Sequence, residues 1–336
     1  MSDRKKLRVG LCGLGEIGQF HLRAINGSDE AELAAVCELD ADLAAKSVGE
    51  NTAIFDDFTK MLAEADLDVV DICLPHHLHV PFATEALRAD CHVILEKPIA
   101  TDLPGCDEIA AAADASGRRV GISYNQVFFA PHRRLAEMLD QGQLGDLRSL
   151  YMRLWMGGKY GGWREDSTQV GGGLLMDAGI HRVYMASRFG GKVQSVSAEM
   201  DNPRSEDSFT ITLNFESGAT GVIQGSYHGP DGVFDDSIGI QASNGMAEVL
   251  GCEAFFEGDL KGETQLRLRQ DGEWKDDPVS DRWDDSVRAS VGAILGSFAE
   301  DTDPEIGLAE GRETVAIVEA AYRSAEQGVR IRISDL

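Results

Sequence analysis

Lys97 is the first candidate for chemistry, because it ends the apolar run Val93-Ile94-Leu95-Glu96-Lys97-Pro98. The run predicts a strand of an open α/β sheet, and ligands of such sheets bind in the crevice outside the carboxyl ends of the strands. An ammonium group loses hydration there and needs a polar partner, which Glu96 or a bound ligand could supply. The alternative is a surface lysine at a strand end, with Pro98 closing the turn.

Asp177 and His181 form a second candidate site. They follow the glycines Gly171, Gly172 and Gly173, and the residues from 174 onward have a helical pattern. Four residues of spacing puts both side chains on one face of a helix, one turn apart. The carboxylate would orient the imidazole and increase its basicity, so that the ring can move a proton near neutral pH. The alternative is a hydrogen bond that only stabilises the helix.

A dinucleotide-binding pattern favours the catalytic interpretation of both sites. The run Gly13-Leu14-Gly15-Glu16-Ile17-Gly18 follows a predicted strand, 7–12, and opens a predicted helix, 17–24. Gly13 permits a tight turn, Gly15 lets backbone amides approach a pyrophosphate, and Gly18 lets the helix pack closely on the strand. The amino end of the helix then faces the anion.

Glu38 closes the second predicted strand 20 residues after Gly18. An acidic side chain at this place accepts hydrogen bonds from the ribose of an adenosine. It would repel a 2′-phosphate, and residues 39–42 offer no arginine to receive one. We therefore expect NAD rather than NADP as the cofactor.

The elements that position these residues divide the chain in two. Short apolar strands alternate with helical segments in the first third, which predicts a doubly wound parallel sheet, the α/β Rossmann architecture. From about residue 149, longer runs alternate with a period of two, which predicts an α+β domain with a large, mostly antiparallel open sheet. The predicted domains are 1–124 and 125–336. The predicted strands are 7–12, 33–37, 69–74, 92–95, 120–123, 208–215 and 220–227, the helices are 17–24, 80–88 and 106–115, and the turns are 216–218 and 243–245.

Composition narrows the function classes. The chain has 336 residues, of which 43% are hydrophobic and 26% charged, as in ordinary soluble two-domain proteins. A formal net charge of -26 argues against binding to nucleic acid. The sequence has neither a signal-peptide core nor an apolar stretch of membrane-spanning length, so we expect a cytoplasmic protein. The six cysteines include no Cys-x-x-Cys and are expected to be buried thiols.

The sequence also bears on whether the protein binds a metal and on whether it assembles. His76, His77 and His79 are close in sequence but have no cysteine or acidic ligand at a fixed spacing, so no metal is expected. The open face of the second sheet needs a cover, and another subunit would supply it. We therefore expect a homodimer or homotetramer that assembles through this sheet.

Together these pieces resemble the glucose-fructose oxidoreductase and inositol dehydrogenase family, Gfo/Idh/MocA. The matching segments are Gly13 to Gly18, Leu74-Pro75-His76-His77-Leu78-His79, Glu96-Lys97-Pro98, Trp163-Arg164-Glu165-Asp166, Gly171 to His181, and Glu319-Ala320-Ala321-Tyr322-Arg323-Ser324-Ala325. The resemblance implies a Rossmann domain followed by an open-sheet domain that often mediates assembly. It also implies oxidation or reduction of a secondary carbinol on a sugar, polyol or related small molecule with a nicotinamide cofactor.

The resemblance also implies roles for individual residues. His181 would accept the hydroxyl proton while hydride leaves the same carbon, and Lys97 would hydrogen-bond the reacting oxygen. Asp177 would position a hydroxyl or orient the base, and Pro98 could follow a cis peptide bond that aims Lys97. Thus Lys97, Asp177 and His181 are the expected catalytic residues.

Further contacts are expected from loops at strand ends. Asn125 could read a substrate hydroxyl or stabilise a turn, and Trp163 could stack on a sugar or pack under its loop. The expected cofactor contacts are Gly13, Gly15, Glu16, Ile17, Gly18, Glu38, Leu74, Pro75, His76, His79, Glu96 and Lys97. The expected substrate contacts are Lys97, Asn125, Tyr160, Trp163, Arg164, Asp177 and His181.

Two other functions remain compatible with these cofactor and catalytic residues. A glycosidase that oxidises its substrate transiently with bound NAD needs the same base and cofactor, and a non-catalytic sensor needs only the dinucleotide fold. The segment 125–129 lacks the arginine that many family members carry shortly after this asparagine, so a charged substrate group is not expected there. The sugar, the reacting hydroxyl and the direction of flux are not readable from the sequence.

Overall fold

The computed structural model describes residues 6–249 and 264–336 and divides into two compact units. The first comprises Met1–Asn125 and Val287–Arg312, and the second comprises Gln126–Ser286 and Glu313–Leu336. The sequence placed everything from residue 125 onward in the second domain. Residues 287–312 instead return to the first unit, because their apolar side chains pack on its sheet.

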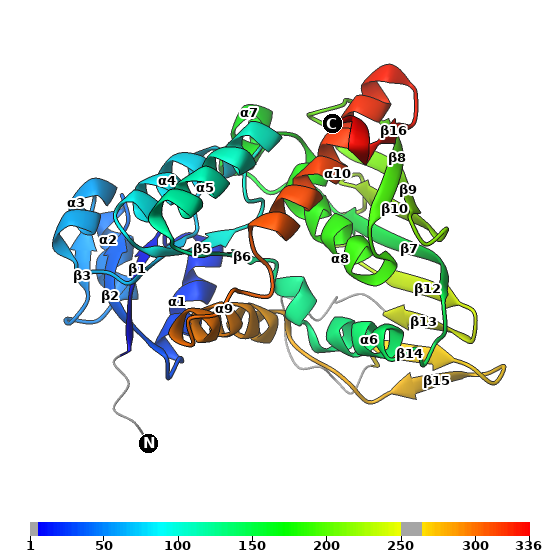
Figure 1. Ribbon diagram of the computed structural model, residues 1–336, viewed down its shortest axis with the longest axis horizontal. Coiled ribbons are helices and arrows are strands. Elements are labelled where there is room, and N and C mark those ends of the chain that lie inside the picture. Colours follow the sequence, from blue (N-terminus) through cyan, green and yellow to red (C-terminus); the bar gives the residue numbers. More distant parts are fainter. Residues whose placement is uncertain (1–5, 250–263) are drawn as a thin grey trace. The chain divides into compact units, whose positions relative to one another are not determined.

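A six-stranded parallel sheet forms the centre of the first unit, in the order β3-β2-β1-β4-β5-β6. Every residue of β4, β5 and β6 is buried, as expected for strands covered on both faces. Helices α4 and α5 lie on one side of the strands, and α1 and α9 lie on the other (Figure 1). The strands are β1 (Leu7–Cys12), β2 (Ala31–Cys37), β3 (Ala53–Phe55), β4 (Val69–Ile72), β5 (His92–Glu96) and β6 (Val120–Ser123), and the helices are α1 (Glu16–Asn26), α2 (Ala41–Ser47), α3 (Phe58–Glu64), α4 (His79–Arg88), α5 (Leu103–Ser116) and α9 (Trp283–Ala299), of which residues from 287 belong to this unit.

Two contacts show why α9 belongs to this sheet. A Cβ atom on Gly121 would lie 2.4 Å from Cγ2 of Ile294, so β6 and α9 meet at a glycine. The rings of His92 and Phe298 stack with their centroids 4.8 Å apart. The doubly wound parallel sheet is thus confirmed, with β3, α2 and α3 added to the predicted elements.

The second unit contains a ten-stranded sheet in the order β15-β14-β13-β12-β7-β10-β9-β8-β16, with β11 paired to β7. Its strands pair in antiparallel fashion except for β7 with β10. This confirms the predicted mostly antiparallel sheet. The strands are β7 (Leu147–Met156), β8 (Val193–Met200), β9 (Ser208–Phe215), β10 (Thr220–Ser226), β11 (Phe234–Asp235), β12 (Ile238–Ala242), β13 (Gly245–Val249), β14 (Leu266–Arg269), β15 (Trp274–Asp277) and β16 (Ile331–Arg332), and the helices are α6 (Ala130–Asp140), α7 (Ser167–Val170), α8 (Ile180–Gly190) and α10 (Leu308–Gln327), of which residues from 313 belong to this unit.

One face of the second sheet is open and carries four large exposed side chains among polar ones. Burial alternates along β9 and β10, and α8 packs against the buried side of β7 and β10. On the other side, Tyr151, Trp155, Val222 and Met246 remain 36–42% exposed. Large apolar side chains gathered on one sheet face are typical of an interaction surface.

The cysteines agree in part with the expected buried thiols. Cys12, Cys73, Cys91 and Cys106 are buried and free, whereas Cys37 is half-buried and not fully buried as expected. Cys252 lies outside the described residues. In the described part of the chain, no helix combines the length and apolar character needed to cross a membrane.

Candidate functional site

The glycine-rich loop after β1 has the geometry that a dinucleotide needs. Gly13 adopts φ +85°, and a Cβ atom on Gly18 would lie 2.1 Å from the carbonyl oxygen of Gly13. Both positions therefore require glycine. Helix α1 follows with Gly15 at its N-cap and without a side-chain cap, and the space beside Gly15 is open for 4 Å. The first amides of α1 are thus available to an anion.

Glu38 lies beside this loop at the end of β2. Its Oε2 accepts a hydrogen bond from the amide of Leu14 at 2.7 Å, and its Oε1 accepts one from the amide of Asp40 at 3.0 Å. The carboxylate is therefore held next to the glycine-rich loop, where the ribose of a dinucleotide would lie. Together the loop, the α1 amino end and Glu38 fit a nicotinamide dinucleotide.

Lys97 follows the last residue of β5, and the Lys97–Pro98 peptide bond is cis, as predicted. The strand order places β5 beside β4 and β4 beside β1, so Lys97 and the glycine-rich loop share one edge of the parallel sheet. The backbone amide of Lys97 donates to Oε2 of the buried Glu96 at 3.1 Å. Glu96 thus fixes the backbone from which the Lys97 side chain extends.

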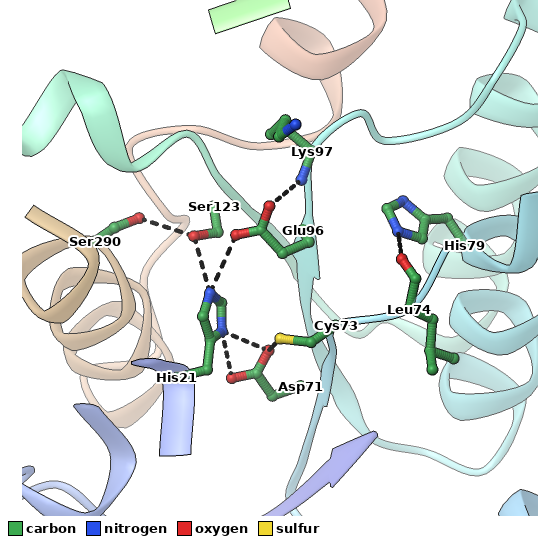
Figure 2. A network of polar contacts seen from close by, with 9 residues as sticks. All are labelled: His21, Asp71, Cys73, Leu74, His79, Glu96, Lys97, Ser123 and Ser290. Carbon is green, nitrogen blue, oxygen red and sulfur yellow. Dashed lines mark hydrogen bonds and ion pairs between the residues drawn. The ribbon is translucent and has the colours of Figure 1, made fainter. Parts of the chain in front are cut away.

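A buried network continues from Glu96 to His21 and Asp71 (Figure 2). Nδ1 of His21 lies 2.9 Å and 3.0 Å from the two Asp71 oxygens, and Nε2 lies 3.1 Å from Oε1 of Glu96. Each ring nitrogen faces a carboxylate, so both carry a proton and donate. His21 is an imidazolium between two carboxylates.

Charge in this network shifts two pKa values. Burial is the largest single influence on His21 and opposes its ionisation, but the charges of Asp71 and Cys73 and the hydrogen bonds to them together raise the His21 pKa well above its ordinary value of 6.5. Burial alone would raise the pKa of Glu96, yet its hydrogen bond and charge interaction with His21 lower it. His21, Asp71 and Cys73 also bring metal-ligating atom types within 4.8 Å of one another, and hydrogen bonds from His21 and from Cys73 to Asp71 account for that approach.

We predict that His21→Gln destabilises the protein by about 3–5 kcal/mol, because it leaves two buried carboxylates without their cation. A folded pKa above the unfolded one gives stability that is complete below pH 6.5 and is lost as the pH rises through the folded value. The difference in the free energy of unfolding between the variant and the wild type should therefore become smaller in alkaline buffer. Urea unfolding from pH 6 to 9 measures it, with the exposed His77→Gln as control; equal stability of H21Q and wild type at pH 6 would contradict the ion network.

The loop after β4 is tied to the loop after β5 by His79. Its buried ring lies 2.6 Å from the carbonyl oxygen of Pro98 through Nδ1 and 2.9 Å from that of Leu74 through Nε2. Burial is the largest influence on this ring and lowers its pKa. The sequence predicts cofactor contacts for His79 and Glu96, and this stays a prediction. In the structure His79 connects the two loops, and Glu96 connects His21 of α1 to the backbone of Lys97.

In the second unit, Arg164 contacts three other residues that were predicted to bind substrate. Its Nε donates to Oδ2 of the buried Asp177 at 3.1 Å. Its guanidinium carbon lies 4.5 Å from the ring centre of Trp163 and 5.5 Å from that of Tyr160. Four of the predicted residues therefore form one cluster.

Tyr227 joins this cluster and was not predicted. Burial raises the pKa of its hydroxyl, and the charge of Asp177 raises it further. The sequence offered only its place at the end of a predicted strand, where a side chain can reach a neighbouring loop. A buried phenol within the electrostatic influence of Asp177 offers a further hydrogen-bonding group near this cluster.

The Asp177–His181 segment departs from the predicted regular helix. Residues Leu175–Gly179 form a π-helical turn (η4), and α8 begins only at Ile180. A π turn is wider than an α turn, and such turns are frequent at functional sites. Asp177 is buried inside the π turn, whereas the half-buried His181 lies in the first turn of α8.

Arg182, the residue after His181, was also missed. It is fully buried and donates through Nη2 to Gln126 and, at 2.9 Å, to Asp236. The neighbouring His132 is buried too, and burial, then the charge of Arg182, lowers its pKa to about 3. An arginine in an otherwise apolar helix pattern was the available signal, since a buried arginine requires an acidic partner.

The predicted residues are therefore distributed over both units. The first unit carries the glycine-rich loop, Glu38, Lys97 and Asn125, which is buried at the start of a short helix, η2 (Asn125–Phe128). The second carries the Arg164 cluster and His181. His76, with Pro75 before it, begins the short helix η1 (His76–Leu78), and its buried ring lies 5.6 Å from that of His79.

Comparison with known proteins matches both units. Residues 7–124 match the family model described as an oxidoreductase family with an NAD-binding Rossmann fold, and residues 132–248 match the GFO/IDH/MocA C-terminal domain. The chain is 27% identical to dTDP-3,4-didehydro-2,6-dideoxy-alpha-D-glucose 3-reductase of Actinomadura kijaniata, with 94% of this chain and 97% of the relative covered.

Two further proteins are similar over nearly their whole length. D-glucoside 3-dehydrogenase of Escherichia coli is 27% identical, with 97% of each chain covered. The solved structure of the WlbA dehydrogenase from Bordetella pertussis, in complex with NADH and UDP-GlcNAcA, has a TM-score of 0.81 and 26% identity, with 99% of each chain covered. The similarity thus extends through both units.

Proposed function

Because this chain belongs to the Gfo/Idh/MocA family of oxidoreductases, we propose that it transfers hydride between a secondary hydroxyl of a sugar, polyol or related small molecule and NAD. The observation that carries this proposal is the position of Lys97 on the same sheet edge as the glycine-rich loop. A reacting group is thereby available beside the cofactor loop. Similar proteins whose names specify a dehydrogenase or reductase of glucosides and nucleotide-linked sugars support the substrate class.

In the proposed reaction, His181 accepts the proton of the substrate hydroxyl as general base. The Lys97 ammonium hydrogen-bonds the same oxygen and stabilises the negative charge that develops on it. Asp177, held by Arg164 at 3.1 Å, orients a substrate hydroxyl or the base. A nicotinamide dinucleotide, which the glycine-rich loop and Glu38 would hold, would supply the acceptor for the hydride of the carbinol carbon. We propose that the first unit binds the dinucleotide and that the second binds the substrate.

The test of this proposal is the absorbance of NADH at 340 nm with NAD and a panel of inositols, aldoses, anhydrosugars and glycosides. Substrate-dependent NADH formation is expected and would rank the substrates. If no compound of the panel gives NADH although NAD binding is confirmed by thermal shift, the result would contradict a dehydrogenase. Release of a chromogenic aglycone without net NADH would assign the site to a redox-neutral glycosidase instead.

We predict that NAD gives a kcat/KM at least about tenfold higher than NADP, because the Glu38 carboxylate would repel a 2′-phosphate. Glu38→Ala should narrow this ratio by raising the KM for NAD, since the ribose loses its acceptor. Steady-state kinetics with both cofactors measure the ratio, and the exposed Asp42→Asn is the matched control. A higher kcat/KM with NADP in the wild type would refute the assignment.

We also propose that a second copy of the chain covers the open sheet face that carries Tyr151, Trp155, Val222 and Met246. These exposed side chains on β7, β10 and β13 support a homodimer or homotetramer. Light scattering at micromolar concentration should give a mass above that of one chain, and a mass of one chain would refute the assembly.

A further inference from the structure

The glycine-rich loop before Asp177 is held by two side chains from distant parts of the second unit. Glu206 comes from the connection between β8 and β9, and Tyr322 comes from α10. Both are fully buried. Neither belongs to the Arg164 cluster, and neither has a role in the proposed proton or hydride transfer.

Glu206 contacts the loop through both its side chain and its backbone. Its Oε1 accepts a hydrogen bond from the amide of Leu175 at 2.8 Å, and its carbonyl oxygen accepts one from the amide of Leu174 at 2.9 Å. These amides stand at the start of the π turn, where helical amides have no partner in their own helix. Glu206 thus supplies the acceptors that the first residues of the segment lack.

Tyr322 completes the anchor. Its hydroxyl donates to Oε1 of Glu206 at 3.1 Å and accepts a hydrogen bond from the amide of Gly173 at 3.4 Å. Cβ atoms on Gly172 and Gly173 would lie 2.0 Å from the Tyr322 hydroxyl and 2.2 Å from the Glu206 carbonyl oxygen. The glycines of this loop are therefore required by the close approach of the anchor and not by a ligand alone.

The anchor is connected directly to the predicted catalytic segment. The carbonyl oxygen of Gly173 accepts a hydrogen bond from the amide of Asp177 at 3.1 Å. Asp177 then leads through the π turn to His181. A displacement of Gly173 would consequently move the backbone of Asp177 and the start of α8.

The Glu206 carboxyl is about half protonated at pH 7 and mostly neutral below it. Its Oε2 is buried and makes no hydrogen bond among the described residues, and burial raises the pKa of the group to about 7. The Arg204 guanidinium lies 5.2 Å from the ring centre of Tyr322. It forms ion pairs with Glu319 and Glu326. A carboxylic acid with one accepting and one protonated oxygen has the same shape and hydrogen-bonding pattern as an amide.

We propose that Glu206 and Tyr322 are positioning residues that hold the Gly173–Asp177 backbone and thereby place Asp177 and His181 for the reaction, an inference that rests on the proposed function. They act through the loop and touch neither substrate nor cofactor. A misplacement of about 1 Å at reacting groups can cost about 100-fold in rate.

The experiment compares Glu206→Ala, Glu206→Gln and Tyr322→Phe with the control Glu137→Gln, which removes an exposed carboxylate from α6 of the same unit. We expect E206A to lower kcat about 10- to 100-fold, with the KM for NAD changed less than about threefold. E206Q should restore kcat to within about threefold of the wild type, because the amide replaces a neutral acid. Y322F should lie between them, since one of two anchoring groups remains.

A second measurement does not depend on turnover. Hydrogen exchange followed by mass spectrometry should show faster exchange of the amides of residues 173–177 in E206A and Y322F, but not in E206Q or E137Q. Unchanged exchange and unchanged kcat in E206A would overturn the positioning role. A wild type that turns over no sugar, but in which exchange responds as expected, would refute the proposed function and leave the anchor intact.

Discussion

Lys97→Ala is expected to lower kcat for the preferred substrate by about 10²- to 10³-fold while leaving the affinity for NAD within about twofold. The ammonium stabilises charge that develops on the reacting oxygen only as the transition state forms, so its loss acts on kcat. The backbone of Lys97 is held by Glu96 through its amide, a contact that the alanine variant keeps. The cofactor loop should therefore remain unchanged.

The measurement is steady-state kinetics at 340 nm together with NAD binding by calorimetry. Lys60→Ala, which removes an exposed lysine from α3 of the same unit, is the matched control. Near-normal turnover in K97A would refute the role of the ammonium. A large loss of NAD affinity with unchanged kcat would make Lys97 a cofactor residue instead.

His181→Ala is expected to lower kcat by about 10²- to 10⁴-fold, the range that a general base contributes. The ring is half-buried in the first turn of α8, next to the buried Arg182. Removal of the imidazole leaves the hydroxyl proton without an acceptor, and hydride cannot leave readily from a neutral alcohol. Arg182 keeps its own bonds to Asp236 and Gln126, so the helix should stay in place.

Chemical rescue distinguishes a base from a structural histidine. Added imidazole should restore part of the H181A activity in proportion to its concentration, whereas a variant with displaced packing would not respond. The exposed His228→Gln, in the same unit, should have wild-type kcat. Full activity of H181A without imidazole would remove His181 from the mechanism.

The sequence by itself determined the features that depend on neighbouring residues. The strands β1, β6 and β9 have the predicted bounds, because alternation and apolar runs reflect burial of each strand on its own. Gly13 adopts the left-handed conformation expected of the fingerprint, and Glu38 lies beside it. The family was also evident from local motifs, and the family models match both units.

Only the tertiary structure decided the contacts that support those motifs. His21 meets Asp71 and Glu96 across 50 and 75 residues, and Tyr322 meets Glu206 across 116. The return of residues 287–312 to the first sheet and the π turn before α8 are equally invisible to local periodicity. The physical reason is that a buried polar side chain must find its partner in three dimensions, and the sequence spacing of that partner is set by the topology rather than by the period of a helix or strand.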